Sequence, residues 1–299
     1  MNILVSGASG LIGQSLVPFL TAAGYRTSHL VRSNRQGEES EVHWNPSAGE
    51  IDAQRLEGFG AVVHLAGEPI AGRWSAAKKS AIRESRVKGT RLLCETLARL
   101  SSPPRVLIAA SAGGYYGDRG DEVLREESAA GSSFLSRVCQ EWEAATKPAA
   151  ARGIRVVNLR MGFILSPRGG GLARMLPAFR TGAGGRIGSG KQYMSWIGID
   201  DLTRMILFAI TTETLSGPVN AVAPNPVTNL EFTRMLGRVL GRPAVFLLPA
   251  VVVRLVFGEM GGEVLLASTR MEPARIESAG FQFRFPDLEG ALRHLLVRG

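Results

Sequence analysis

The chain begins with Met1-Asn2-Ile3-Leu4-Val5-Ser6-Gly7-Ala8-Ser9-Gly10-Leu11-Ile12-Gly13, and this stretch decides the fold. Residues 2–5 predict a short buried strand, and the apolar run from Leu11 to Leu20 predicts a helix directly after the turn. The three glycines between them are spaced as G-x-x-G-x-x-G. Gly7 allows a sharp turn, Gly10 lets a phosphate approach the backbone, and Gly13 lets the helix pack tightly on the strand. Because free N–H groups and the helix dipole at such a helix start bind an anionic pyrophosphate, the stretch predicts a dinucleotide-binding turn.

The length and composition predict a soluble globular protein. The 299 residues, 45% of them hydrophobic, are enough for one large domain or two unequal ones with a well-buried core. We expect no signal peptide, because the first residues already form the nucleotide-binding strand. The longest apolar run, Pro243 to Phe257, is interrupted by Pro249 and Arg254 and is too short to span a bilayer. Cys94 and Cys139 lie in helical patterns and predict reduced thiols of a cytoplasmic protein without a membrane partner.

The formal net charge of +9 permits a nucleic-acid partner on charge alone. Only five of the 35 basic residues are lysines, and the arginines are scattered without a basic tail or a patch interleaved with aromatic residues. Since nucleic-acid binders gather basic residues on one face, we expect no nucleic-acid partner. An anionic cofactor is the simpler partner for this charge, and no metal site is predicted.

The end of the second strand predicts which dinucleotide is bound. Arg26 to Val31 predicts this strand, and Arg32 and Ser33 follow it. A dinucleotide fold contacts the adenosine ribose at this point, where an acidic residue binds the 2′-hydroxyl of NAD and an arginine suits a 2′-phosphate. Arg32 therefore predicts NADP(H), with a solvated surface arginine as the alternative.

Strand and helix patterns alternate through residues 1–163. Further strands are predicted at residues 42–44 (an edge strand), 61–65, 105–110 and 154–159, and further helices at residues 75–100 and 133–152. Such alternation predicts an α/β fold, Rossmann-like, in which a doubly wound parallel sheet has right-handed crossovers. His64 lies within a predicted strand, and we interpret it as a buried histidine with a satisfied hydrogen bond rather than a catalyst.

One strand end carries hydroxyl groups suited to catalysis. The predicted strand at residues 105–110 ends in Ser111-Ala112-Gly113-Gly114-Tyr115-Tyr116-Gly117. A doubly wound sheet places its chemistry at the carboxyl ends of its central strands. Ser111, Tyr115 and Tyr116 are therefore the candidate catalytic residues, and lining of a pocket is the alternative role for the two tyrosines.

The alternation ends after Leu165, which predicts a second, smaller unit. We assign residues 1–164, together with 198–222, to a dinucleotide-binding domain, and residues 165–197 and 223–299 to a smaller α+β substrate lobe. Helices are predicted there and nearby at residues 172–180, from a cap at Asp200-Asp201 to about 210, 229–240 and 288–297.

Three residues of this lobe are candidates for the substrate pocket. They are Gln192, Ser195 and Trp196. Packing of the lobe against the sheet is an equally good role for Trp196. The nearby match of residues 185–191 to G-x-x-x-x-G-K is not a phosphate loop, because Gln192 replaces the magnesium-binding hydroxyl residue and no strand precedes it.

Several motifs together carry a family resemblance. Gly7-x-x-Gly10-x-x-Gly13, the strand ending in Ala66-Gly67 and the Tyr116-Gly117 pair resemble the extended short-chain dehydrogenases/reductases, the NAD(P)-dependent epimerase/dehydratase superfamily. Further motifs resemble one atypical epimerase-family subfamily, often labelled cell-division-inhibitor-like. These motifs are Gly67-Glu68-Pro69-Ile70, Arg73-Trp74, Ser85-Arg86-Val87, Trp142-Glu143, Gly169-Gly170-Gly171, Ser195-Trp196-Ile197 and Gly258-Glu259-Met260.

The resemblance covers nearly the whole chain and implies a set of cofactor contacts. It implies a Rossmann domain with a smaller C-terminal lobe, NADP binding and a homodimer. The residues implied to line the cofactor are Gly7, Ser9, Gly10, Leu11, Ile12, Gly13, Arg32, Ser33, Leu65, Ala66, Gly67, Glu68, Arg86 and Phe163. Among them, Phe163 is expected near the nicotinamide.

The chain departs from the superfamily in its catalytic device, which is Tyr-x-x-x-Lys on the helix after the active-site strand. Four residues after Tyr25, Tyr115, Tyr116 and Tyr193 stand His29, Arg119, Gly120 and Ile197, so the motif is absent. Alignment on Trp142-Glu143 puts Leu135 and Cys139 in its place.

Two functions are consistent with this departure. In the first, the protein is an NADP-dependent oxidoreductase or epimerase acting on a small carbonyl or sugar-nucleotide-like substrate. Tyr115 or Tyr116 would donate the proton, Ser111 would orient the substrate oxygen, and Arg119 beside Tyr115 would favour the phenolate. In the second, the protein binds NADP without efficient turnover and serves as a regulatory or scaffold protein linked to cell division.

Overall fold

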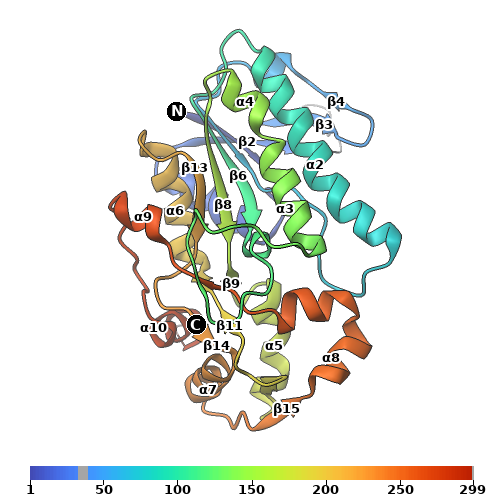
Figure 1. Cartoon of the computed structure of the whole chain (residues 1–299). Helices are drawn as coiled ribbons and strands as arrows, with labels where there is room; N and C mark the ends of the chain where they lie inside the picture. Colours follow the sequence, from blue (N-terminus) through green and yellow to red (C-terminus); the bar gives the residue numbers. More distant parts are fainter. Residues whose placement is uncertain (33–39, 298–299) are drawn as a thin grey trace.

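The computed structural model describes residues 1–32 and 40–297, and its centre is an eight-stranded sheet (Figure 1). The strand order is β13-β8-β6-β5-β1-β2-β3-β4, and every neighbouring pair is parallel except β3 and β4. The strands are β1 (Asn2–Ser6), β2 (Arg26–Val31), β3 (Glu41–Asn45), β4 (Glu50–Ile51), β5 (Ala61–His64), β6 (Val106–Ala112), β8 (Arg155–Met161) and β13 (Gly217–Ala221). The predicted Rossmann-like α/β fold is therefore confirmed.

The strand order reverses at β1, and this reversal indicates where on the sheet a ligand binds. The chain proceeds from β1 through β2 to β3 on one side and then crosses to β5 on the other side of β1. In open α/β sheets such a reversal leaves a crevice at the carboxyl ends of the two central strands. The turns after Ser6 and His64 both lie at this crevice, because these residues are register partners.

Helices cover both faces of the sheet. One face packs against α1 (Leu11–Ala22) and α6 (Ile199–Thr211), whose apolar side chains share a core with β1, β5, β6, β8 and β13. Figure 1 shows α2 (Ala76–Arg99), α3 (Phe134–Ala144) and α4 (Lys147–Ala151) gathered on the opposite face. Alternate residues of the buried strands point to the two cores, as the period of two in a strand requires.

Besides the two cores on the faces of the sheet, a smaller core lies below its carboxyl edge. Its centre is Trp196, Phe232 and Leu236, which are fully buried. The helices around it are α5 (Gly170–Arg180), α7 (Asn229–Leu240) and α10 (Leu288–Val297), and the short strands are β9 (Phe163–Leu165), β10 (Gly185–Ile187), β11 (Tyr193–Met194), β12 (Trp196–Gly198), β14 (Val227–Thr228) and β15 (Phe246–Leu248).

The remaining described elements are short. They are η1 (Gln54–Leu56), η2 (Gly113–Tyr115), β7 (Val123–Leu124), α8 (Ala250–Phe257), η3 (Gly261–Leu266), β16 (Arg270–Met271) and α9 (Ala274–Ser278). Within the described part of the chain, no helix combines the length and the apolar character needed to cross a membrane.

Three sequence-based boundaries are corrected. The predicted edge strand forms as β3, but β4 lies outside it and is the edge. The predicted helix at residues 133–152 is two helices, because Pro148 has no N–H with which to continue α3 and instead begins α4. The cap of α6 is Gly198 rather than Asp200-Asp201.

Candidate active site

The glycine turn, residues 6–13, is shaped by backbone contacts that exclude side chains. Gly7 has φ of 69°, and a Cβ there would lie 2.9 Å from the carbonyl carbon of Leu65. A Cβ on Gly13 would lie 2.4 Å from the carbonyl oxygen of Gly7, so the start of the helix packs tightly on the turn that follows the strand. Gly10 is the N-cap of α1 and contributes no side-chain cap. The N–H groups of the first helical turn, at Leu11 and Ile12, therefore face the crevice without a capping side chain among the described residues.

A second glycine-rich helix start lies against this turn. α5 has Gly169 as its N-cap, again without a side-chain cap, and Gly170 has φ of 74°. A Cβ on Gly170 would lie 2.9 Å from Cδ2 of Leu11. Two uncapped helix starts thus converge on one place, which favours an anionic group there.

A buried hydrogen-bond network fixes the turn after β5 relative to β1. The backbone N–H groups of Leu65 and Ala66 donate to Oγ of Ser6 at 3.0 and 3.2 Å. Since that oxygen already accepts twice, its proton goes to Nδ1 of His64 (2.7 Å), and Nε2 of His64 donates to Oγ1 of Thr90 (3.0 Å). Burial lowers the pKa of His64 to about 4. The interpretation of His64 as a satisfied buried histidine is confirmed.

The other predicted cofactor residues after β5 lie at the same edge. Gly67 packs on Arg86, since a Cβ on Gly67 would lie 3.4 Å from Cζ of that arginine. Arg86 donates from Nη1 to the carbonyl oxygens of Glu68 (2.9 Å) and Ile82 (3.1 Å). The carboxylate of Glu68 accepts from Nζ of Lys78 at 2.6 Å, so this side chain is already engaged.

Arg32 follows β2 directly and is exposed. Because Ser6 pairs with Leu30 across the sheet, Arg32 lies beside the first residues of the glycine turn. Ser33, predicted with it, falls outside the described residues.

Ser111, Glu143 and Arg160 form a closed hydrogen-bond network at the end of β6. Ser111 is 2% exposed, and its hydroxyl donates to Oε1 of Glu143 on α3 at 2.7 Å. The same carboxylate accepts from Nε of Arg160 at 2.8 Å and from Nη2 at 2.9 Å. Such a bidentate pair fixes both partners, so Ser111 is held by the protein and is not free to orient a substrate oxygen.

Tyr116 is part of this buried network. Its side chain is fully buried, and its single hydroxyl proton has two acceptors in reach, Oδ1 of Asn220 (2.8 Å) and the carbonyl oxygen of Arg125 (3.0 Å), while the hydroxyl oxygen accepts from Nη1 of Arg160 (3.0 Å). Burial raises the pKa of Tyr116 to about 12. This geometry gives Tyr116 a structural role and weighs against the predicted role as proton donor.

Tyr115 differs from its neighbour, because it is only partly buried. Cζ of Arg160 lies 3.4 Å from the centre of its ring, and among the described residues its hydroxyl has no hydrogen-bond partner. The predicted partnership with Arg119 is wrong, since that guanidinium is held by Glu122 at 2.6 and 2.8 Å and by the carbonyl oxygen of Ala129. The cation beside Tyr115 is instead Arg160.

The face of α3 toward this loop carries Leu135 and Cys139 beside the polar Ser136, whose hydroxyl donates to the carbonyl oxygen of Gly114 at 2.9 Å. A Cβ on Gly114 would lie 3.2 Å from Cβ of Leu135 and 4.0 Å from Sγ of Cys139. Cys94 and Cys139 are both free and buried, as predicted, and burial raises the pKa of Cys139 to about 12. A thiol in this state is a packing group rather than an acid or base at neutral pH.

The three predicted pocket residues of the smaller lobe are buried in it. Nε2 of Gln192 donates to the carbonyl oxygens of Ile187 and Leu265. Oγ of Ser195 donates to the carbonyl oxygen of Thr269 and accepts from the N–H of Met271, both at 2.7 Å. Trp196 is fully buried, and its Nε1 donates to the carbonyl oxygen of Asn225 at 2.9 Å.

These three side chains therefore have structural partners, and their place in a substrate pocket stays a prediction. Phe163, by contrast, is only partly buried and begins β9 just beyond the end of β8. It packs edge to face on Phe232, at 5.8 Å between ring centres.

Two functional candidates were missed from the sequence, Arg160 and Glu143. The available signal was a charged residue directly after the predicted strand at residues 154–159, because such a charge needs a partner once it is buried. The partner lies 17 residues earlier on another element, so it could not be identified from spacing.

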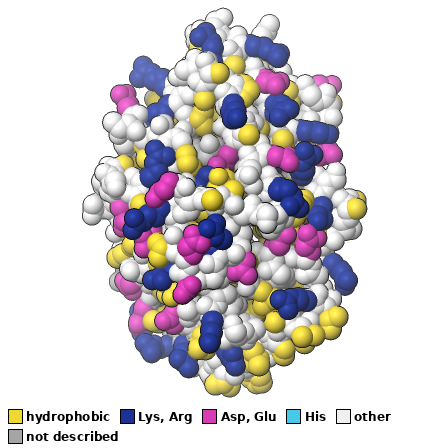
Figure 2. All heavy atoms as spheres, in the orientation of Figure 1, with side chains coloured by type: hydrophobic (Ala, Val, Ile, Leu, Met, Phe, Trp, Pro, Cys, Tyr) yellow, Lys and Arg dark blue, Asp and Glu magenta, His cyan; other side chains and the backbone are white. Residues whose placement is uncertain are grey.

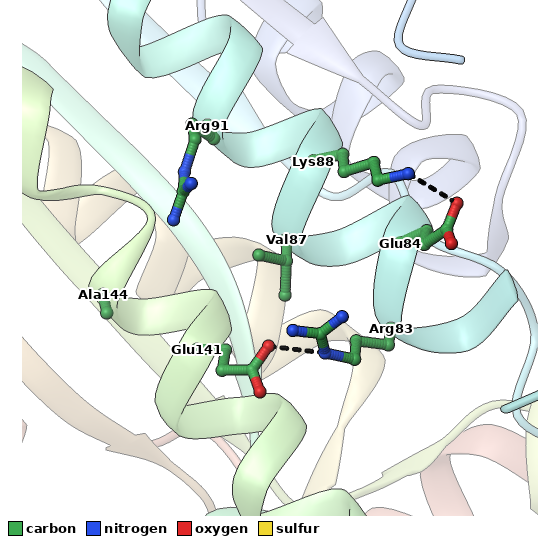
Figure 3. Close-up of a pocket in the computed structure, with 7 residues that line it drawn as sticks. All are labelled: Arg83, Glu84, Val87, Lys88, Arg91, Glu141 and Ala144. Carbon is green, nitrogen blue, oxygen red and sulfur yellow. Dashed lines mark hydrogen bonds and ion pairs between the residues drawn. The ribbon is translucent and has the colours of Figure 1, made fainter. Parts of the chain in front are cut away.

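A separate groove of about 400 Å³ lies on the outer side of α2 and α3 (Figure 3). Its charges are mostly paired, Arg83 with Glu141 at 2.6 Å and Lys88 with Glu84 at 2.9 Å. Figure 2 shows basic side chains interspersed with acidic ones over one face of the molecule. The groove and this face thus show no concentrated positive field.

The chain matches two families of known proteins. Residues 3–221 match the NAD dependent epimerase/dehydratase family, and residues 248–295 match a domain of unknown function. Epimerase family protein MT2273 from Mycobacterium tuberculosis is 46% identical over 297 residues, which are 99% of this chain and 98% of that protein.

Two solved structures are similar over the whole of this chain or nearly so. Human epimerase family protein SDR39U1 (isoform 2) with NADPH is 32% identical, covers 100% of both chains and superposes with a TM-score of 0.92. A nucleoside-diphosphate sugar epimerase from Corynebacterium glutamicum is 39% identical with a TM-score of 0.81, over 99% of this chain and 58% of that one.

Proposed function

The chain belongs to the NAD dependent epimerase/dehydratase family, and we propose that it binds NADP(H) and acts on a small carbonyl or sugar-nucleotide-like substrate as an oxidoreductase or epimerase. The observation that carries the catalytic part is the hydroxyl of Tyr115. Of the three hydroxyls predicted at the end of β6, those of Ser111 and Tyr116 are held by the protein and that of Tyr115 is not.

The residues at the crevice fit a dinucleotide phosphate. The glycine turn and the uncapped starts of α1 and α5 suit the pyrophosphate. Leu65, Ala66 and Gly67 lie at the neighbouring strand end. Arg32 suits the 2′-phosphate. The similar human protein is described with NADPH, which supports the same cofactor here.

The proposal divides the work between two parts of the chain. Residues 1–164 with 198–222 would hold the cofactor, and residues 165–197 with 223–299 would cover the substrate. In support, α6 and β13 pack with the main sheet, whereas α5, α7 and α10 share the smaller core.

Proton transfer is assigned to Tyr115. When bound, the cofactor would supply or accept a hydride at its nicotinamide ring. The Tyr115 hydroxyl would give its proton to the substrate oxygen in the reducing direction and regain one from water. Arg160 lies over the ring, so a positive charge is in place beside the phenolate that forms. Glu143 holds Arg160 there through two hydrogen bonds.

The test is NADPH consumption by the purified protein with a panel of carbonyl and sugar-nucleotide substrates. Tyr115→Phe should lower kcat by about 100-fold or more while leaving NADPH affinity unchanged, because only the proton is lost. Tyr25→Phe, which removes a phenol far from this edge, is the matched control. Native turnover by Tyr115→Phe would refute the assignment.

The cofactor preference has its own test. Arg32→Ala should lower the ratio of NADPH to NADH affinity about tenfold, because a charge-assisted contact to the 2′-phosphate is removed. Arg26→Ala, at the other end of β2, is the control for general surface charge. An unchanged ratio in Arg32→Ala would show that another residue reads the 2′-phosphate.

A second candidate function is an NADP-binding regulatory protein without efficient turnover. It is favoured by one observation, which is that the buried Leu135 and Cys139 stand on α3 at the positions where the superfamily carries its catalytic tyrosine and lysine. Tight NADPH binding with no consumption across the whole panel would support this candidate over the first.

A further inference from the structure

Exposed apolar side chains gather at one place in this molecule. Of the twelve large hydrophobic side chains that are exposed among the described residues, nine lie between residues 245 and 264. Val245 is 81% exposed, Leu255 69% and Val251 65%. We call residues 245–256 the apolar patch. Single exposed hydrophobic residues are ordinary, but a cluster of this kind indicates a binding surface.

The patch is formed by elements that the fold leaves mostly uncovered. All eight residues of α8 except Arg254 are apolar, yet only Val253 is buried. β15 is exposed at all three residues and pairs only with β10 among the described strands. Figure 1 shows both elements at the lower end of the molecule, and Figure 2 shows hydrophobic side chains gathered along that end.

The charged residues in this part of the chain are all positive. Between Glu231 and Glu259 the chain carries four arginines and no acidic residue. Arg242 precedes the patch and Arg254 lies within it, and both are exposed. Glu259 is paired with Lys79 at 2.8 Å, so it does not offset them. The surface is therefore apolar with a positive rim, and its partner should be apolar with a negative rim.

We propose that the apolar patch docks this protein on an anionic lipid surface, with β15 and α8 lying at the boundary of headgroups and acyl chains. Valine and leucine dominate the patch, and tyrosine, tryptophan and methionine, which are enriched in protein interfaces, are absent from its sequence. Pro243 and Pro249 flank β15, which discourages pairing of its free edge with another strand. Arg242 and Arg254 complement lipid phosphates.

The docking is peripheral. α8 has eight residues, about 12 Å of helix, and this is far less than the thickness of a bilayer. The sequence-based expectation that no segment spans a membrane therefore stands, and the expectation of no membrane partner is the one that this inference revises.

The test is flotation of the full chain with vesicles of phosphatidylcholine, with and without phosphatidylglycerol. The native chain should bind the vesicles that contain phosphatidylglycerol. The double variant Val251→Ser/Leu255→Ser should lose at least about tenfold in partitioning, since two exposed apolar groups no longer enter the lipid. The double variant Arg242→Gln/Arg254→Gln should lose about twentyfold, and only on anionic vesicles.

Val297→Ser is the matched control, because this valine is 54% exposed on α10 away from the patch. It should bind as the native chain does. All these positions are exposed, so unchanged thermal unfolding of each variant checks that the fold is intact. Absence of native binding to anionic vesicles would overturn the proposal. So would a native dimer that Val251→Ser/Leu255→Ser converts to a monomer without any vesicle binding, because the partner would then be a second copy.

Discussion

The turn after β1 and the loop after β6 lie at the same edge of one sheet, but they satisfy their polar groups in opposite ways. The N-cap of α1 is a glycine and no side chain caps the helix, so the backbone N–H groups at its start remain available. At the end of β6 and in the loop after it, Ser111 and Tyr116 are held in hydrogen bonds with Glu143, Arg160 and Asn220. A site built from backbone stays open for a ligand, whereas a site built from side chains can be closed by the protein itself.

The comparison has a consequence for function. The cofactor half of the crevice depends on shape, because Gly7 and Gly13 leave no room for a Cβ. The catalytic half depends on the hydroxyl of Tyr115, which lies outside the buried network. Variants of the two halves should therefore fail in different ways, by lost binding in the first and by lost turnover or lost stability in the second.

The largest effect is expected where the buried network is broken. Arg160→Met leaves the Glu143 carboxylate without its partner, and the free energy of unfolding should fall by about 3–5 kcal/mol. Chemical denaturation measures this loss. Arg125→Met, which breaks an exposed pair with Glu272, should cost about 1 kcal/mol or less. An equal loss of unfolding free energy in the two variants would contradict the description of Arg160 and Glu143 as a closed, buried network.

The next effect is a pH dependence from His64, beneath the glycine turn. Its pKa is about 4 in the folded protein and 6.5 as a free side chain, so the unfolded chain binds the proton more readily. The contribution of neutral His64 to the free energy of unfolding is thus fully present above pH 6.5. It is lost as pH falls toward 4, by about 3 kcal/mol in total.

Unfolding measured at several pH values in this window, for the native chain and His64→Gln, checks this loss. The variant removes the titrating group, so its stability should fall less steeply. Parallel pH profiles for the two proteins would show that the histidine does not remain neutral under the turn.

A smaller effect on stability is expected in the glycine turn itself. Gly13→Ala places a Cβ 2.4 Å from the carbonyl oxygen of Gly7, which must move, at a cost of about 2 kcal/mol. NADPH affinity should fall about tenfold or more, because the N–H groups of α1 move with the turn. Calorimetric titration and thermal unfolding measure the two effects.

Gly262→Ala is the control for Gly13→Ala, because nothing lies within 4 Å of a Cβ at that position. It should leave cofactor affinity unchanged. A Gly13→Ala variant that binds NADPH with native affinity would show that the turn adapts and that its shape does not limit binding.

The parts of the fold that were predicted correctly depend on residues close together in the sequence. β1, the glycine turn and α1 follow from adjacent residues whose conformational needs are strong. The helix at residues 229–240 follows from Thr228 and Glu231, which form a capping box three residues apart. In each case the deciding contacts lie within a few residues.

Other side chains have distant partners that the sequence did not reveal. Gln192 and Ser195 have the polar side chains of pocket residues, but Leu265 and Thr269 satisfy them about 70 residues later. Asp201 was expected to cap α6, and instead it accepts from the N–H groups of Arg284 and Phe285 at 2.9 Å. Nothing near these residues in the sequence indicates that their hydrogen bonds are already made.

The sequence alone determined the Rossmann-like fold and its dinucleotide-binding turn, because glycine spacing and strand–helix alternation are local signals. Only the tertiary structure separated Tyr115 from Tyr116. The two are identical neighbours in the chain, and burial of one beside Asn220 and Arg160 commits its hydroxyl while the other stays free. The physical reason is that hydrogen-bond satisfaction is decided by contacts across the fold, over 104 residues from Tyr116 to Asn220, and not by spacing along the chain.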